Sequence, residues 1–94
     1  MLAGSALHAA NEAMRLADVD PVKAIPLASR IVDTAQGDAA AQALAEQAWG
    51  HALAQTGQVD LAVTHLRRAV RLGTGKAAAE SRMKLAFALV HQGR

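Results

Sequence analysis

Histidine is the residue type in this chain best suited to chemistry, and its spacing argues against a site. The chain carries His8, His51, His65 and His91. No histidine stands four residues from another, which is the spacing that places two zinc ligands on one face of a helix. His51 and His65 could face each other across a helical hairpin, but two ligands without a third make a weak site. We therefore expect no metal site, and we interpret all four histidines as surface or boundary residues.

Nucleophilic and acid–base chemistry also lack the patterns they require. The chain has no cysteine, and no nucleophile-elbow motif surrounds Ser5, Ser29 or Ser81. Its acidic residues are scattered and show no paired arrangement for general acid–base catalysis. Residues 73–76 (GTGK) lack the full phosphate-loop pattern and lie between two expected helices instead of after a strand. We expect no catalytic residue and no cofactor, and we predict that the chain is not an enzyme.

Helices are the elements that must position these side chains. Alanine, the strongest helix former, makes up about a quarter of the chain, whereas aromatic residues make up only 2%. This composition favours closely packed helices and argues against a β-sandwich, which needs β-branched and aromatic residues. Apolar spacing and short turns predict five antiparallel helices. They cover about residues 5–18, 21–36, 39–56, 60–72 and 76–92.

Capping residues mark the ends of these predicted helices. Ser5, Asp20 and Asp38 can each accept a hydrogen bond from the free amides of a helix start, and Asp60 opens the fourth helix. Pro21 suits a first helical position. After each later helix comes a glycine that we expect in the left-handed conformation of a C-terminal cap. These glycines are Gly37, Gly57, Gly73 and Gly93.

A repeated pattern indicates how the helices are arranged. The run LAQTG at residues 53–57 resembles LVHQG at residues 89–93, an offset of 36 residues. This offset is close to the ~34-residue period of a tetratricopeptide repeat (TPR). Gly50 is expected to let the partner helix of its hairpin approach. The second helix of a TPR docks through small, large and small residues, which are here Ala62, Leu66 and Ala69.

Residues 43–74 therefore resemble one nearly complete TPR. Residues 79–93 resemble the first helix of the next unit, and residues 5–36 resemble a degenerate preceding unit. Glu46 departs from the pattern, because TPRs prefer a bulky residue at its position. We predict a single all-α domain over residues 1–94, in which antiparallel helical hairpins stack as a right-handed TPR-like superhelix of about two and a half repeats. An ordinary amphipathic helix bundle is the alternative.

Two longer runs carry a finer resemblance. HALAQTGQVDLAVTHLRRAVRLG (residues 51–73) and AAAESRMKLAFALVHQGR (residues 77–94) look like the N-terminal repeat regions of actinobacterial CHAT proteins, which attach a caspase-like protease domain to TPRs. The resemblance implies a bacterial protein-interaction or scaffold module that forms the N-terminal regulatory or recognition arm of a longer CHAT-type protease protein. None of the catalytic His/Cys machinery of that family lies in these residues.

The predicted fifth helix has apolar residues on more than one face, whereas a complete repeat array ends with a polar capping helix. We therefore expect the chain to be a fragment of a longer protein, cut after Arg94. If it is not, a small self-associating adaptor that pairs through this uncovered helix is the alternative function. The chain lacks a secretory signal and any run near ~18 apolar residues, so we expect a cytoplasmic protein that does not engage a membrane.

The concave side of the predicted repeats is the candidate binding surface, because TPR proteins hold peptides there. The candidate partner-binding residues are Leu44, Gln47, His51, Gln55, Met83, Phe87 and His91. Chaperone-binding TPRs grip a terminal carboxylate with Lys, Arg and Asn at such places, and this set contains none of them. Met83 and Phe87 instead suggest an apolar contact with a protein or peptide.

Charge is distributed unevenly along the chain. Residues 1–60 hold three basic and seven acidic residues, a net charge of −4, whereas residues 61–94 hold seven basic residues and one acidic residue, a net charge of +6. The candidate basic patch consists of Arg67, Arg68, Arg71, Lys76, Arg82 and Lys84. Such a patch could attract an acidic protein surface or nucleic acid. Because aromatic stacking residues are almost absent, nucleic acid is the less favoured partner.

Overall fold

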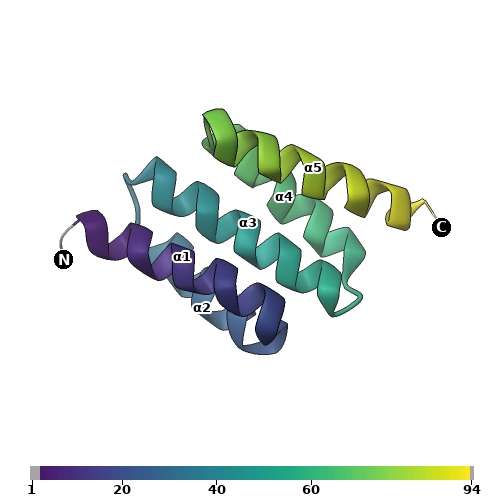
Figure 1. Ribbon diagram of the computed structural model, residues 1–94, viewed down its shortest axis with the longest axis horizontal. Helices are drawn as coiled ribbons and strands as arrows, with labels where there is room; N and C mark the ends of the chain where they lie inside the picture. Colours follow the sequence, from purple (N-terminus) through teal and green to yellow (C-terminus); the bar gives the residue numbers. More distant parts are fainter. Residues whose placement is uncertain (1–2, 94) are drawn as a thin grey trace.

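The computed structural model describes residues 3–93 and folds them into five α-helices (Figure 1). They are α1 (Ala3–Val19), α2 (Pro21–Thr34), α3 (Ala39–Gln55), α4 (Val59–Leu72) and α5 (Gly75–Gln92). No strand occurs within the described residues, so the all-α class and the five helices are confirmed. Connections of one to four residues make consecutive helices antiparallel neighbours. Arg94, after which we expected the chain to be cut, lies outside the described residues.

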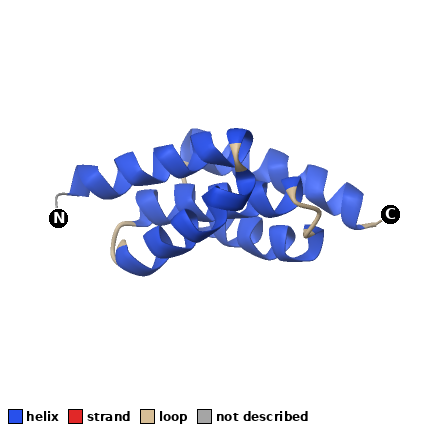
Figure 2. Cartoon of the chain, turned by 90° about the horizontal axis from the view of Figure 1, so that it is seen from below, coloured by secondary structure: helices blue, strands red, loops and turns tan. Residues whose placement is uncertain are grey.

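The helices form two layers, with α1, α3 and α5 in one and α2 and α4 in the other (Figure 1, Figure 2). α3 is central, since it alone packs against all four other helices. α5 packs mainly on α4 and contacts α3 much less than α1 does from the other side. This unequal packing leaves space between α3 and α5. Within residues 3–93, no helix combines the length and the apolar character needed to cross a membrane.

Aspartate caps begin two of the helices, as the sequence predicts. Asp20 Oδ1 accepts a hydrogen bond from the backbone N–H of Lys23 at 3.3 Å. Asp38 Oδ1 accepts one from the backbone N–H of Ala41 at 3.1 Å. Each cap satisfies an amide that would otherwise lack a partner, a contribution of about 1 kcal/mol.

Two predicted helix starts are wrong. Ser5 lies inside α1, because the alanine-rich sequence around it continues the helix to Ala3. Asp60 is not a cap, because α4 begins one residue earlier, at Val59. Val59 packs against a cluster formed with α5, so helix formation there buries apolar surface. Asp60 instead lies in the first turn, where a carboxylate interacts favourably with the helix dipole.

The four glycines that follow helices divide into two groups. Gly57 has a φ value of 84° and directly follows the C-cap Thr56, so its left-handed cap is confirmed. Gly37 also has a positive φ, 86°, but it stands two residues after the C-cap Ala35, in the turn that the Asp38 N–H closes by donating to the Ala35 carbonyl oxygen. Gly73 and Gly93 have φ values of −83° and −73°, so the same prediction is wrong for them. At Gly73 the chain is extended and passes directly into the next helix, which needs no left-handed residue.

Alanine and glycine let the helices approach closely. Most of the fully covered apolar residues are alanines, and the largest side chain among the fully covered apolar residues is Leu66. A Cβ atom at Gly50 would lie 2.6 Å from the Leu66 Cγ and 3.1 Å from the Ala62 carbonyl oxygen. The predicted close approach of α4 at Gly50 is therefore confirmed, because any larger residue would push the two helices apart.

Candidate functional site

The main cavity of the described residues lies between α3 and α5, with α4 as its floor. We call it the α3/α5 groove, and its volume is about 760 Å³. In Figure 1, α4 is seen between and behind the two helices that form the walls. The walls and floor are mainly apolar. The lining residues are His51, Ala54, Gln55, Val59, Leu66, Met83, Lys84, Phe87, Ala88 and His91.

Polar contacts hold α3 and α5 together at one end of the groove. The Ser81 hydroxyl donates a hydrogen bond to Gln47 Oε1 at 2.9 Å, and both side chains are buried. One turn further along, Lys84 Nζ lies 3.5 Å from His51 Nδ1. Beyond this contact the wall of α3 presents Ala54, which is too short to fill the space between the two helices. The groove is therefore closed at the Gln47 end and open towards the C-terminal ends of both helices.

His51 links the three helices of one layer. Its Nε2 lies 2.7 Å from Asp18 Oδ1 on α1, and its Nδ1 faces Lys84 on α5. When Nε2–H donates to the carboxylate, Nδ1 is left as an acceptor for the Lys84 ammonium group. The ring is thus oriented from both sides at the groove wall. The contacts position Lys84 at the rim, where its ammonium group can meet a bound partner.

Two large apolar side chains extend from α5 over the groove. Met83 is 73% exposed and Phe87 is 65% exposed, although both are of types that are usually buried. They stand one turn apart on the same wall, and the Phe87 ring lies 4.3 Å from the His91 ring. Exposed apolar side chains gathered beside a hollow and rimmed by polar groups are typical of an interaction surface.

The structure brings together five of the seven residues predicted for the concave face. His51, Gln55, Met83, Phe87 and His91 all line the α3/α5 groove.

The other two predicted residues lie elsewhere. Leu44 packs, half-buried, against the core between α1, α2 and α3. Gln47 is covered by α5 through its hydrogen bond with Ser81, and its Nε2 has no hydrogen-bond partner. Neither side chain lines the groove, because α3 has neighbours on every side along its N-terminal half.

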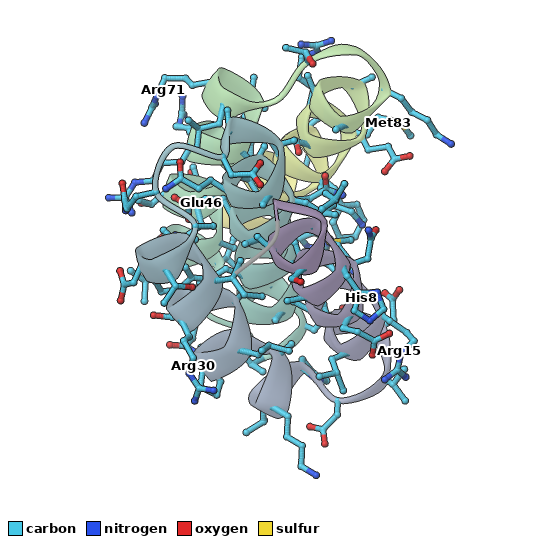
Figure 3. The ribbon with its side chains drawn as sticks, turned by 90° about the vertical axis from the view of Figure 1, so that its left-hand side faces the viewer. His8, Arg15, Arg30, Glu46, Arg71 and Met83 are labelled. Atoms are coloured by element: carbon cyan, nitrogen blue, oxygen red, sulfur yellow. The ribbon has the colours of Figure 1, made fainter. Side chains whose placement is uncertain are left out.

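The six predicted basic residues do not form one patch. Arg67, Arg68 and Arg71 share the exposed face of α4, as their spacing predicts. Lys84 lies instead in the α3/α5 groove. Figure 3 shows Arg71 on one side of the molecule and Met83, on the groove side, on the other. The difference arises because α5 packs with its Lys84 face towards α3. The arginines of α4 point away from the layer that α1, α3 and α5 form.

The remaining members of the predicted patch lie on α5. Lys76 is almost fully exposed, and its Nζ lies 3.9 Å from Glu80 Oε1. Arg82 is also exposed. Only Lys84 among the six basic residues lines the groove.

A buried polar cluster is the feature that sequence reasoning missed. His65 Nδ1 lies 2.7 Å from Glu46 Oε1, with His65 7% and Glu46 3% exposed. The Trp49 ring stacks on the imidazole at 3.8 Å with 20° between the planes. The prediction that every histidine is a surface or boundary residue is therefore wrong for His65. The sequence did contain a signal for this cluster, because Glu46 occupies a position where the repeat pattern expects a buried bulky residue. A buried carboxylate needs a polar partner, which a neighbouring helix can supply.

The cluster contributes to packing between α3 and α4 and lies away from the groove lining. Within the described residues, no three histidine or acidic side chains lie close enough together to hold a metal ion. The α3/α5 groove is therefore the candidate binding site of the described residues. The chain matches no protein-family model, no curated protein and no solved structure.

Proposed function

We propose that this chain is a protein-interaction module that binds a segment of another protein in the α3/α5 groove. The observation that carries the proposal is the pair Met83 and Phe87, exposed on a wall of an apolar hollow. Burying a large apolar side chain contributes about 1.5–3 kcal/mol, so two such residues are sufficient anchors for an interface. The volume of about 760 Å³ suits one face of a peptide or helix.

The proposal includes a TPR-like stacking of the helices. Three features support it: the 36-residue offset between the two LxxxG runs, the alternation of helices between two layers, and the packing of Leu66 on Gly50. The helices of the groove wall, α3 and α5, are then the first helices of consecutive repeats. Attachment of this module to a CHAT-type protease remains a prediction from the quoted runs.

Site-specific photo-crosslinking tests the binding surface. A photoreactive phenylalanine analogue replaces Phe87 in one variant and Val22 in a control variant. Val22 is equally apolar and exposed but lies on α2, far from the groove. In the cells that produce the protein, we expect a discrete crosslinked protein from position 87 and none from position 22. Equal products from both positions, or none from position 87, would refute the proposed interface.

Self-association through α5 is the second candidate function. Val90 is exposed in addition to Met83 and Phe87, so the helix presents apolar surface that another copy could cover. Sedimentation velocity over a range of concentrations tests this candidate. A mass that rises with concentration in the native chain, and does not rise in a Phe87→Ser variant, would favour it over a heterologous partner.

Nucleic-acid binding is supported only by the exposed arginines Arg67, Arg68 and Arg71 on α4. It predicts an affinity for DNA or RNA that falls steeply with added salt.

A further inference from the structure

We propose that the occupant of the α3/α5 groove is an amphipathic helix that places a carboxylate against Lys84. This inference rests on the proposed function and adds the conformation and the charge of the partner. Three features of the groove support it: the small number of free hydrogen-bonding groups, the positive charge and the spacing of the apolar side chains.

The groove offers few hydrogen-bond partners for an extended backbone. All three elements that line it are helices, whose backbone amides and carbonyls are already paired within the helix. Gln55 is the one amide side chain in the lining, and most of the other surfaces are apolar. An extended peptide would bury unpaired backbone groups against those surfaces, which is costly. A helix satisfies its own backbone and can bury side chains alone.

The charge of the lining favours an acidic partner. Lys84 and two histidines line the groove, and the lining contains no carboxylate. Asp18 is held by His51 at 2.7 Å, and no carboxylate of the described residues lies within 4 Å of Lys84. A partner that covered Lys84 without supplying a counter-charge would bury an unpaired ammonium group. A carboxylate on the partner removes that cost and forms a charge-assisted hydrogen bond.

A second copy of α5 fits less well for the same reason. Lys76, Arg82 and Lys84 lie on this helix, and Glu80 is its one carboxylate. Pairing two copies of α5 would bring like charges together, and Glu80 is already close to Lys76. Like-charge contacts at an interface oppose association, so α5 of a second copy is an unfavourable occupant of the groove.

The apolar anchors define the spacing of the partner. Met83 and Phe87 form one wall, while Val59 at the open end and Leu66 beside Gly50 form the floor. A helix that lies along this wall presents two large apolar side chains one turn apart to the hollow. Lys84 directly follows Met83 on α5, so the carboxylate of the partner lies beside its apolar pair, at the level of Met83. The expected partner motif is therefore an acidic residue beside an apolar pair at i and i+4.

A displayed library of peptides about 16 residues long tests the inference, because a helix of this length spans about 24 Å and so exceeds the stretch of α5 from Met83 to His91 that lines the groove. The library randomises charge and helix propensity around a fixed apolar pair. We expect selected peptides to be helix formers with an acidic residue at one register. Exchanging that residue for lysine should weaken binding about tenfold in fluorescence anisotropy.

Two charge-reversal variants provide the matched comparison. Lys84→Glu should reverse the preference, so that the lysine peptide binds more tightly than the acidic one. Arg71→Glu makes the same charge change on the far face of α4 and should leave the preference intact. Circular dichroism of each variant establishes that it remains folded.

The outcomes separate this inference from the proposed function. Selected peptides that bind the groove but are extended, basic or indifferent to charge would overturn the inference and leave the interaction module standing. An unchanged preference in Lys84→Glu would also overturn it. Absence of any selected peptide, together with no crosslink from position 87, would overturn both.

Discussion

Removing one partner of the buried Glu46–His65 pair is predicted to destabilise the chain strongly. Glu46→Ala deletes the acceptor of a 2.7 Å contact and leaves the His65 ring covered without a partner. An unsatisfied buried polar group costs about 1–3 kcal/mol, and the lost methylene group adds about 0.8 kcal/mol. The expected loss in the free energy of unfolding is about 3 kcal/mol. A chain of this length has a total stability of about 5–14 kcal/mol, so the variant should still fold.

His65→Ala should cost as much or more, about 3–5 kcal/mol, because it leaves the Glu46 carboxylate buried without its hydrogen-bond donor and removes the ring that stacks on Trp49. Replacing both residues by leucine should restore stability to within about 1 kcal/mol of the native chain, since the polar pair is then exchanged for apolar packing. The leucine double variant should therefore be at least about 2 kcal/mol more stable than either single alanine variant.

Urea unfolding followed by far-UV circular dichroism measures these values, because the only tryptophan is part of the cluster and would report the substitution itself. Glu12→Ala is the control. Glu12 pairs with Arg15 at 3.0 Å on the surface, and its loss should cost less than about 0.5 kcal/mol. A Glu46→Ala variant as stable as Glu12→Ala, or a leucine double variant no more stable than the single variants, would refute the reasoning.

Three further predictions follow from other contacts. Gly50→Ala should destabilise the chain by about 1–3 kcal/mol in the same assay, because its Cβ atom would lie 2.6 Å from Leu66 Cγ. Gly93→Ala is the control and should be nearly neutral, since the nearest atom to its Cβ would be 3.6 Å away. Asp38→Ala should cost about 1 kcal/mol by removing the cap of α3; a loss below the error of the measurement would contradict that role. Phe87→Ser should change the free energy of unfolding by less than about 0.5 kcal/mol, because the ring is mostly exposed. The same variant should lower the fluorescence of a bound apolar dye. A large loss of stability would show that the ring is part of the core.

Local signals in the sequence were sufficient to predict the helices. Alanine content, the aspartates at positions 20 and 38, and the glycines at positions 37 and 57 act through the backbone of a few neighbouring residues. Their effects do not depend on the rest of the fold. Gly50 differs from these residues, because its role depends on Leu66 of the next helix and was predicted from the repeat pattern.

The candidate site depended on longer-range contacts, so only part of it could be predicted. Helical spacing correctly indicated that Met83, Phe87 and His91 share a face with one another. It could not show that Ser81 would cover Gln47, because that contact joins residues 34 positions apart on different helices. It also could not separate Lys84 from the arginines of α4, since their separation follows from the direction in which α5 packs.

The sequence by itself determined that five helices form and where α2 and α3 begin, because alanine content and the aspartate caps act within one turn of backbone. Only the tertiary structure decided which polar residues are buried and which basic residue lines the groove. Burial is a property of the packing between helices: Glu46 becomes tolerable in the interior only when α4 places His65 within 2.7 Å of it. The groove likewise exists because α5 rests on α4 and meets α3 at one end, an arrangement that no single helix specifies.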